Sequence, residues 1–191
     1  MHKKYTTPLS IFVIFENTNV ILWTSDSFQP NSYIVYFNQI WFFSINLFIK
    51  KDLFLSNSFL FENTAIDFKK NFRSLNYFNN NINIVNEIAI VYMYFFFFLK
   101  TKLIFMLFYN KKYKVNSIDC IFKSASWLER EVSEMFKIVF KNKTDKRRLL
   151  LDYSKQENPL LKSFPSEGFT DVFYNFFENQ TLYNYNSTIE L

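Results

Sequence analysis

Three carboxylates lie close together near the middle of the chain and are the first candidates for chemistry. Glu129, Glu131 and Glu134 could act as general acids or bases. All three lie beside Arg130 on one expected helix, where acidic side chains more often form ion pairs or cap the helix. Arg130 and Glu134 are four residues apart and can pair. We therefore expect no catalytic residue here, and we expect Glu131, at the border of the two helix faces, to form a partly buried ion pair within the chain or across an interface.

The residue counts argue against a cofactor held by this chain alone. The sequence has one cysteine (Cys120), one histidine (His2) and one glycine (Gly168). An iron–sulfur cluster requires about four thiolates, a histidine-based metal site requires several imidazoles, and a dinucleotide-binding loop requires several glycines. We expect the chain to bind no FMN, no NADH and no metal cluster.

A basic run follows the carboxylates and leaves two interpretations open. Its six cations fall within twelve residues: Lys137, Lys141, Lys143, Lys146, Arg147 and Arg148. Such a run could contact a phosphate backbone, as in an organellar RNA-binding or ribosomal protein. No RNA-binding motif accompanies it and Asp145 interrupts it, so a solvated or partner-facing loop is the other interpretation.

The element that positions the carboxylates is a helix. Ser126, with Glu129 three residues later, has the form of a capping box. Apolar residues then recur at helical spacing, at Leu128, Val132, Met135 and Val139. This pattern predicts an amphipathic helix with Glu129, Arg130 and Glu134 on its outer side.

The remaining elements follow from periodicity and turn residues. We expect a strand or short helix in 1–15, a strand at 19–23, a helix from 38 to 51, a loop over 69–86 and a short helix capped at 116–117 that runs to 122. After residue 151 the chain becomes irregular, and Phe164 to Gly168 forms a turn in which Pro165 fixes φ and Gly168 can adopt positive φ. Because Gly168 is the only glycine, we expect a Cβ to clash there.

The apolar stretch from Ile88 to Phe108 could be a membrane span or a hairpin. A span needs about 20 apolar residues, and each of Lys100 and Lys102 costs about 2.5–3.5 kcal/mol at mid-membrane depth. Aromatic and β-branched residues on both sides of these lysines favour strands. We expect antiparallel strands at 90–99 and 103–109, with Thr101 at the turn.

Composition adds one clue to the origin of the chain. Among 191 residues there are 27 phenylalanines and 12 tyrosines, and the formal net charge is +5. Asn, Ile, Lys and Phe are encoded by codons rich in A and T, which indicates an A/T-rich genome such as that of an organelle.

The central segment resembles the signature of a known family, the 30 kDa subunit of respiratory NADH:ubiquinone oxidoreductase (complex I). The match covers about a quarter of the chain strongly, and 62–68 resembles a further block of the family. The matching residues are Glu129-Arg130-Glu131, Glu134-Met135-Phe136, Lys143, Arg147-Arg148-Leu149-Leu150, Asp152-Tyr153, Pro159, Lys162, Phe164-Pro165, Gly168-Phe169 and Tyr174.

The resemblance implies both a fold and a role. The fold is α+β, a small mixed sheet with a β-hairpin and packed helices, in a core domain over 1–150 that is followed by an extended segment over 151–191 docking on a partner. The role is that of a non-redox core subunit of the matrix arm, packed against the 49 kDa-type subunit at the matrix face of the mitochondrial inner membrane. FMN, iron–sulfur clusters, NADH and ubiquinone then belong to other subunits.

The family signature also implies a structural or partner-binding role for its residues in this chain. These are Glu129, Arg130, Glu131, Glu134, Arg147, Arg148, Asp152, Tyr153, Phe164, Pro165 and Gly168. We expect Arg147 and Arg148 each to have its own acceptor, and one of them to be buried against the partner or the tail near Asp152. The chain departs from the family at Lys137, where the family has glycine, and at Lys143-Thr144, where it has His-Pro. A lysine in a left-handed cap costs about 1 kcal/mol, so the helix either continues through Lys137 or tolerates strain there.

Overall fold

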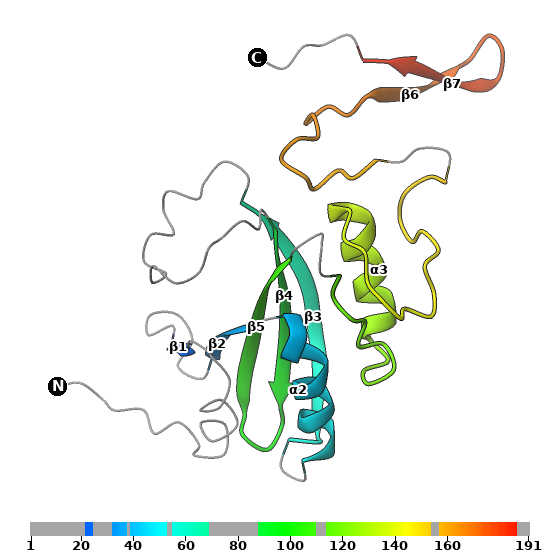
Figure 1. The fold of residues 1–191 in the computed structure, drawn as a ribbon. Coiled ribbons are helices and arrows are strands. Elements are labelled where there is room, and N and C mark those ends of the chain that lie inside the picture. Colours follow the sequence, from blue (N-terminus) through cyan, green and yellow to red (C-terminus); the bar gives the residue numbers. More distant parts are fainter. Residues whose placement is uncertain are drawn as a thin grey trace.

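A computed structural model describes residues 22–24, 32–37, 39–52, 55–68, 88–109, 114–153 and 157–186. These residues form a mixed sheet with two helices, followed by a separate two-stranded ribbon (Figure 1). The expected α+β fold is confirmed. Residues 1–15 and 69–86, for which we predicted a strand or helix and a loop, lie outside the described residues.

The main sheet has five strands in the order β1-β2-β5-β4-β3. Its strands are β1 (Leu22–Thr24), β2 (Ser32–Phe37), β3 (Ser58–Asp67), β4 (Ile88–Phe96) and β5 (Thr101–Tyr109). Strands β2 and β5 are parallel, and every other neighbouring pair is antiparallel. The predicted hairpin is therefore confirmed as β4–β5. Its turn occupies residues 97–100, with Lys100 at φ 47°, so that Thr101 is the first residue of β5 and lies just after the turn.

One face of the sheet carries the core. Because side chains alternate along a strand, Tyr92 and Tyr94 of β4 point to the same face, and both are buried. Helix α2 (Gln39–Lys51) lies on this face. The ring of Phe42 is 4.6 Å from that of Tyr92, and the hydroxyl of Tyr94 donates to Asn46 Oδ1 at 2.6 Å. The predicted helix over 38–51 is thus confirmed and packs through its inner face. None of the helices in the described part of the chain combines the length and apolarity that a bilayer crossing requires.

Helix α3 (Ala125–Phe136) contains the signature carboxylates and lies beside β3 (Figure 1). The segment before it is a turn and not the helix predicted over 116–122. In this segment Asn116 bridges to Lys141, and the amide of Phe122 donates to the Ile118 carbonyl at 2.9 Å. The ring of Phe122 then contacts Tyr94 at 5.4 Å, which fixes the start of α3 against the core.

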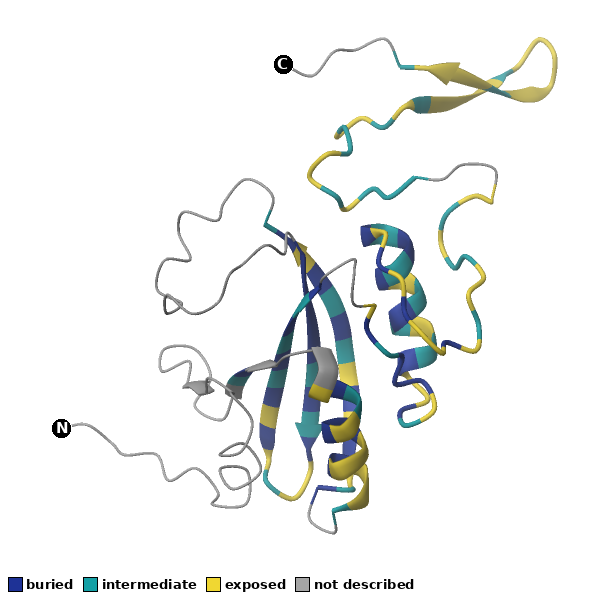
Figure 2. Ribbon diagram, in the orientation of Figure 1, coloured by how far each residue is buried: buried dark blue, intermediate teal, exposed yellow. Residues whose placement is uncertain are grey.

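The tail contains a ribbon that the sequence did not predict. Strands β6 (Thr170–Asn175) and β7 (Gln180–Tyr185) pair with each other in an antiparallel hairpin. Neither contributes a residue to the hydrophobic core, and both faces of the ribbon are largely exposed (Figure 2). The tail therefore has its own secondary structure, although the main sheet does not cover it.

Candidate functional site

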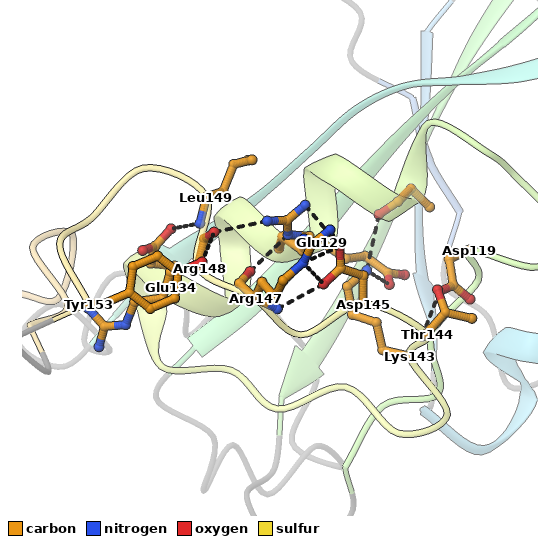
Figure 3. Close-up of polar contacts among 12 residues, drawn as sticks. Asp119, Glu129, Glu134, Lys143, Thr144, Asp145, Arg147, Arg148, Leu149 and Tyr153 are labelled. Carbon is orange, nitrogen blue, oxygen red and sulfur yellow. Dashed lines mark hydrogen bonds and ion pairs between the residues drawn. The ribbon is translucent and has the colours of Figure 1, made fainter.

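Glu129 lies at the centre of a buried polar network (Figure 3). Its side chain is 0% exposed, and it accepts from the amide of Ile118 at 3.0 Å and from the hydroxyl of Ser117. Lys143, which is also buried, brings its Nζ atom to 3.1 Å from Glu129 Oε2. Burial raises the pKa of Glu129, while these hydrogen bonds and the Lys143 charge act in the opposite direction. The network ties α3 to the segment before it and to the loop after it.

This position corrects two expectations for the helix. Ser126 is not the cap, because α3 begins at Ala125 after Ser124, whose hydroxyl bonds the Leu60 carbonyl at 3.1 Å. Glu129 was expected on the outer side, yet it lies on the buried side. The buried positions of the helix are Ala125, Glu129, Val132, Glu134 and Phe136. The stripe predicted from apolar residues alone is rotated around the helix axis relative to the buried stripe, because the buried stripe contains carboxylates that an apolar pattern leaves out.

Glu134 holds the start of the tail to the helix. Its Oε2 atom accepts from the amides of Leu149 and Leu150 at 3.0 and 2.9 Å, and its Oε1 atom accepts from Leu151 at 2.9 Å. Partial burial acts to raise the pKa of Glu134, but the three amides, with Arg148 nearby, lower it below its ordinary value. The carboxylate is thus committed to backbone donors. The expected pairing with Arg130 is replaced by these bonds.

Arg130 binds the basic run from the other side. Its Nε and Nη2 atoms donate to the carbonyls of Arg147 and Arg148, each at 2.9 Å, and its Nη1 atom lies 3.3 Å from Asp145 Oδ2. Arg147 also pairs with Asp145 at 2.9 Å. This pairing, together with Arg130, depresses the pKa of the Asp145 carboxyl strongly. Asp145, which in the sequence merely interrupts the basic run, is the acceptor that organises it.

Each of the paired arginines has its own acceptor. Arg147 uses Asp145 and keeps 76% of its side chain exposed, whereas Arg148 is half-buried and donates from Nη1 to the Asp152 carbonyl at 2.7 Å. Tyr153 is exposed, and its hydroxyl reaches the Arg148 carbonyl at 3.4 Å. Burial of either arginine against another subunit remains a prediction.

Two signature positions differ from expectation in exposure or conformation. Glu131 is exposed, so it forms no buried ion pair within the described chain. Its side chain projects away from the core because the buried stripe passes through Glu129 and Val132. Lys137 has φ 57° and ψ 37°, which is the left-handed conformation, so the helix ends at Phe136 and the strained cap is the alternative that holds.

The turn at Phe164 to Gly168 is confirmed. The amide of Gly168 donates to the Pro165 carbonyl at 3.1 Å, and Gly168 has φ 74°. The expected steric reason is wrong, because a Cβ at Gly168 would meet nothing closer than Phe164 Cε1 at 4.0 Å. The requirement for glycine is the positive φ, which L-residues adopt at a cost. The turn leads into β6, and the rings of Phe164 and Phe169 pack at 5.1 Å.

Sequence reasoning missed three polar residues of the network. Asp119 accepts at one oxygen from the amide and hydroxyl of Thr144, at 3.0 and 2.8 Å. Ser117 serves Glu129, and Asn158 donates to the Glu134 carbonyl. No local spacing joins these residues to their partners, which lie 12 to 25 positions away along the chain.

The arrangement can bind and hold backbone, and a cavity lies beside it. The carboxylate oxygens of Glu129 and Glu134 already accept hydrogen bonds from donors of the chain, so neither is available as a general base at neutral pH. Among the described residues, no group of three or more His, Cys, Asp or Glu side chains is placed to hold a metal ion. A cavity of about 300 Å³ lies between the end of α3, residues 138–140 and the basic run.

Comparisons with known proteins agree with one another. Residues 43–170 match the family described as the respiratory-chain NADH dehydrogenase, 30 Kd subunit. The chain is 36% identical over 188 residues to NADH-ubiquinone oxidoreductase subunit 9 of Paramecium primaurelia. The alignment covers 98% of this chain and 88% of that protein. The subunit 9 of Paramecium tetraurelia is 34% identical over 191 residues, with the same coverage.

A solved structure shows the same fold. It is a chain of the membrane-bound sulfane sulfur reductase, an archaeal respiratory membrane complex. The TM-score is 0.61 at 15% identity, and the match covers 82% of this chain and 84% of that one.

Proposed function

Because the chain belongs to the 30 kDa subunit family of the respiratory-chain NADH dehydrogenase, we propose that it is a non-redox core subunit of the peripheral, matrix arm of NADH:ubiquinone oxidoreductase. In this role it supports assembly and positions the quinone-reducing module. Electrons pass from NADH to ubiquinone through FMN and iron–sulfur clusters in other subunits. The single cysteine, histidine and glycine of the chain support this division of labour, since they supply too few ligands for a cluster or a nucleotide loop.

The proposed partners are the 49 kDa-type subunit and other peripheral-arm subunits. The proposed location is the matrix face of the mitochondrial inner membrane, with the gene in the organelle genome. The abundance of Asn, Ile, Lys and Phe, whose codons are rich in A and T, supports an organellar gene. The names of the Paramecium relatives, which are subunits of an oxidoreductase, support an assembled complex.

The observation that carries the proposal is the exposed ribbon β6–β7. A two-stranded hairpin is marginally stable in water by itself. This one leaves Val172, Tyr174 and Tyr183 about half exposed or more, and Phe177 at its tip is 99% exposed. Apolar surface of this extent marks a protein contact. The ribbon therefore fits a docking element on another subunit.

The start of the tail is anchored to the body, as a docking arm requires. Glu134 holds residues 149–151, and the amide of Lys162 donates to Asp67 Oδ2 at 2.9 Å. The part of the tail beyond these anchors is the ribbon. The signature residues thus serve docking indirectly, because they fix where the ribbon leaves the core.

The RNA-binding alternative gains no support from the basic run. Lys143 is buried against Glu129, and Arg147 is paired with Asp145. These two cations neutralise carboxylates of the chain itself. The exposed aromatic side chains of the ribbon lie on a different element from the basic run.

The proposal can be tested with an affinity-tagged copy of the chain that is expressed in its own organelle. After mild detergent extraction and native electrophoresis, we expect the tag to co-migrate with a large complex that oxidises NADH. Co-purified proteins identified by mass spectrometry should include a 49 kDa-type subunit. Migration of the tag with ribosomes, or as a free chain beside an untagged active complex, would contradict the proposal.

A further inference from the structure

The cavity beside α3 is strongly cationic. Glu134 is the one carboxylate among its lining residues, and Glu129 and Asp145 pair with cations of the wall. The lining therefore has six cations and one carboxylate, and an excess of three positive charges is left when Glu129 and Asp145, which lie outside the lining, are also counted. The six are Arg130, Lys137, Lys143, Lys146, Arg147 and Arg148.

Two of these cations are available to a ligand. Lys137 and Lys146 are exposed, and the ammonium group of neither makes a hydrogen bond or ion pair with another described residue. Lys137 lines the cavity and is the left-handed cap that ends α3. Arg147 adds a third exposed charge, although its Nε and Nη2 atoms face Asp145. Concentrated charge of one sign in a concave wall raises the local concentration of oppositely charged groups.

The wall is also partly apolar. Ile138, Val139 and Phe140 line the cavity, and Val139 is exposed. A cavity that combines lysines with apolar side chains fits a peptide whose carboxylates are flanked by apolar residues. The guanidinium groups of Arg130 and Arg147 are already directed at carbonyls and at Asp145, so they form no fork aimed at a phosphate. Charge complementarity therefore favours carboxylates borne by a protein over a phosphate group.

We propose that this cavity receives an acidic segment of a neighbouring subunit, with two or more Asp or Glu side chains bound at Lys137 and Lys146. The inference rests on the proposed function, because the segment belongs to another subunit of the same complex. It adds a second contact that differs from the ribbon in chemistry, since the ribbon contact is aromatic and this one is ionic. It also gives a use to Lys137, at which the family signature has glycine.

The first experiment identifies the occupant in the assembled complex. A benzophenone amino acid replaces Val139, an exposed residue of the lining that carries no charge, and the isolated complex is irradiated and digested. We expect the crosslinked peptide to come from another protein subunit and to contain at least two Asp or Glu within a few residues. A crosslink to RNA, to a lipid or to a peptide without acidic residues would overturn the inference.

The second experiment tests the charge. The double variant Lys137→Glu/Lys146→Glu is compared with Lys51→Glu/Lys123→Glu, a matched reversal at two exposed lysines outside the cavity. We expect incorporation of the cavity variant into the complex to fall about ten-fold, because like charges oppose one another at the contact. Incorporation of the control should stay close to that of the unmodified chain. Equal incorporation of the two variants overturns the inference.

A charge swap separates a contact from a folding defect. Acidic residues of the crosslinked peptide are changed to lysine in the partner and combined with the cavity variant. Recovery of incorporation in the combined strain supports the ionic contact, and failure to recover contradicts it. If the unmodified chain itself does not enter the complex, the proposed function fails. If it enters and only these tests fail, the cavity inference alone is lost.

Discussion

Among the ion pairs of the described residues, Glu129 and Lys143 form the one in which both side chains lie out of water. Breaking a buried pair by removing one partner typically costs about 3–5 kcal/mol, since it leaves a charge buried alone. The pair of Asp145 with the exposed Arg147 is different, because solvent screens an exposed pair and leaves it a small contribution to stability. The two ion pairs look alike in the sequence, and burial is what separates them.

The first prediction concerns this pair. Glu129→Gln leaves the Lys143 ammonium buried without its counter-charge, and we expect the free energy of unfolding of the full chain to fall by about 3–5 kcal/mol. Glu131→Gln, an exposed change on the same helix, should alter it by less than about 0.5 kcal/mol. Adding Lys143→Met to Glu129→Gln should recover part of the loss. Denaturant unfolding measures all three, and equal values for the two glutamate variants would refute the role of the buried pair.

The second prediction concerns pH and Glu134. Its pKa is lowered in the fold, so its carboxylate contributes stability that is fully present above the unfolded pKa of about 4.3 and is lost as pH falls through the lower folded value. Glu134→Gln keeps one acceptor oxygen and places an amide group against a backbone donor. We expect this variant to lose about 1–3 kcal/mol at pH 7.

The pH profile distinguishes this charge effect from a packing defect. The difference between the unmodified chain and Glu134→Gln should begin to shrink as pH falls below about 4.3, where the unfolded carboxyl becomes protonated. It should be smallest below the lower folded pKa, where the carboxyl is protonated in both states. Unfolding curves measured between neutral and acidic pH supply the comparison. A difference that stays constant with pH would mean that Glu134 acts through shape alone.

At the scale of the element, the end of α3 contains strain that a single substitution can release. Lys137 has φ 57°, a conformation that costs residues with a Cβ about 1 kcal/mol and glycine much less. We expect Lys137→Gly to unfold with a free energy about 1 kcal/mol higher than Lys137→Ala. Both variants lack the lysine charge, so the difference between their free energies of unfolding in denaturant isolates the cost of the left-handed backbone conformation. A glycine variant less stable than the alanine variant would contradict the left-handed cap.

Elements with strong local signals were predictable from the sequence. Helix α2 followed from helical spacing, and the β4–β5 hairpin followed from aromatic strands on both sides of Lys100 and Lys102. The turn at Gly168 followed from the preference of glycine for positive φ. In each case the information lies within a few residues of the element that it determines.

The features that were missed depend on distant partners. Glu129 enters the core because Ser117 and Lys143, 12 and 14 residues away, satisfy its oxygens, and no local pattern contains that fact. Strand β7 was missed because its faces are not divided into apolar and polar sides, so alternation gives no signal. In both cases the information lies outside the local pattern, in residues distant in the sequence for Glu129 and in the pairing with β6 for β7.

At the scale of the whole molecule, exposed apolar side chains occur on several elements. Trp41 and Phe48 are exposed on α2, and Phe59 and Phe61 are exposed on β3. Phe177, at the tip of the ribbon, is also exposed. Monomeric proteins rarely expose large contiguous apolar patches, so this distribution fits a subunit with more than one neighbour. The ribbon is the extreme case, since it contributes nothing to the core.

The last prediction separates docking of the ribbon from chemistry. Phe176 and Phe177 lie at the tip between β6 and β7, and both are almost fully exposed. The variant Phe176→Ser/Phe177→Ser removes no core contact, so the free energy of unfolding of the isolated chain should change by less than about 0.5 kcal/mol. Its incorporation into the complex should nevertheless fall by about 30-fold. This corresponds to the loss of about 2 kcal/mol of binding free energy from the two aromatic side chains together.

The control and the activity measurement make this outcome decisive. Glu178→Ser alters the same tip without removing an aromatic side chain, and its incorporation should remain near that of the unmodified chain. Because the ribbon is proposed to position and not to react, NADH:ubiquinone activity per assembled complex should be unchanged in the fraction of the double variant that does assemble. Normal assembly with reduced activity per complex would place the tip near the reaction instead. Normal assembly with normal activity would show that the aromatic tip contacts no partner.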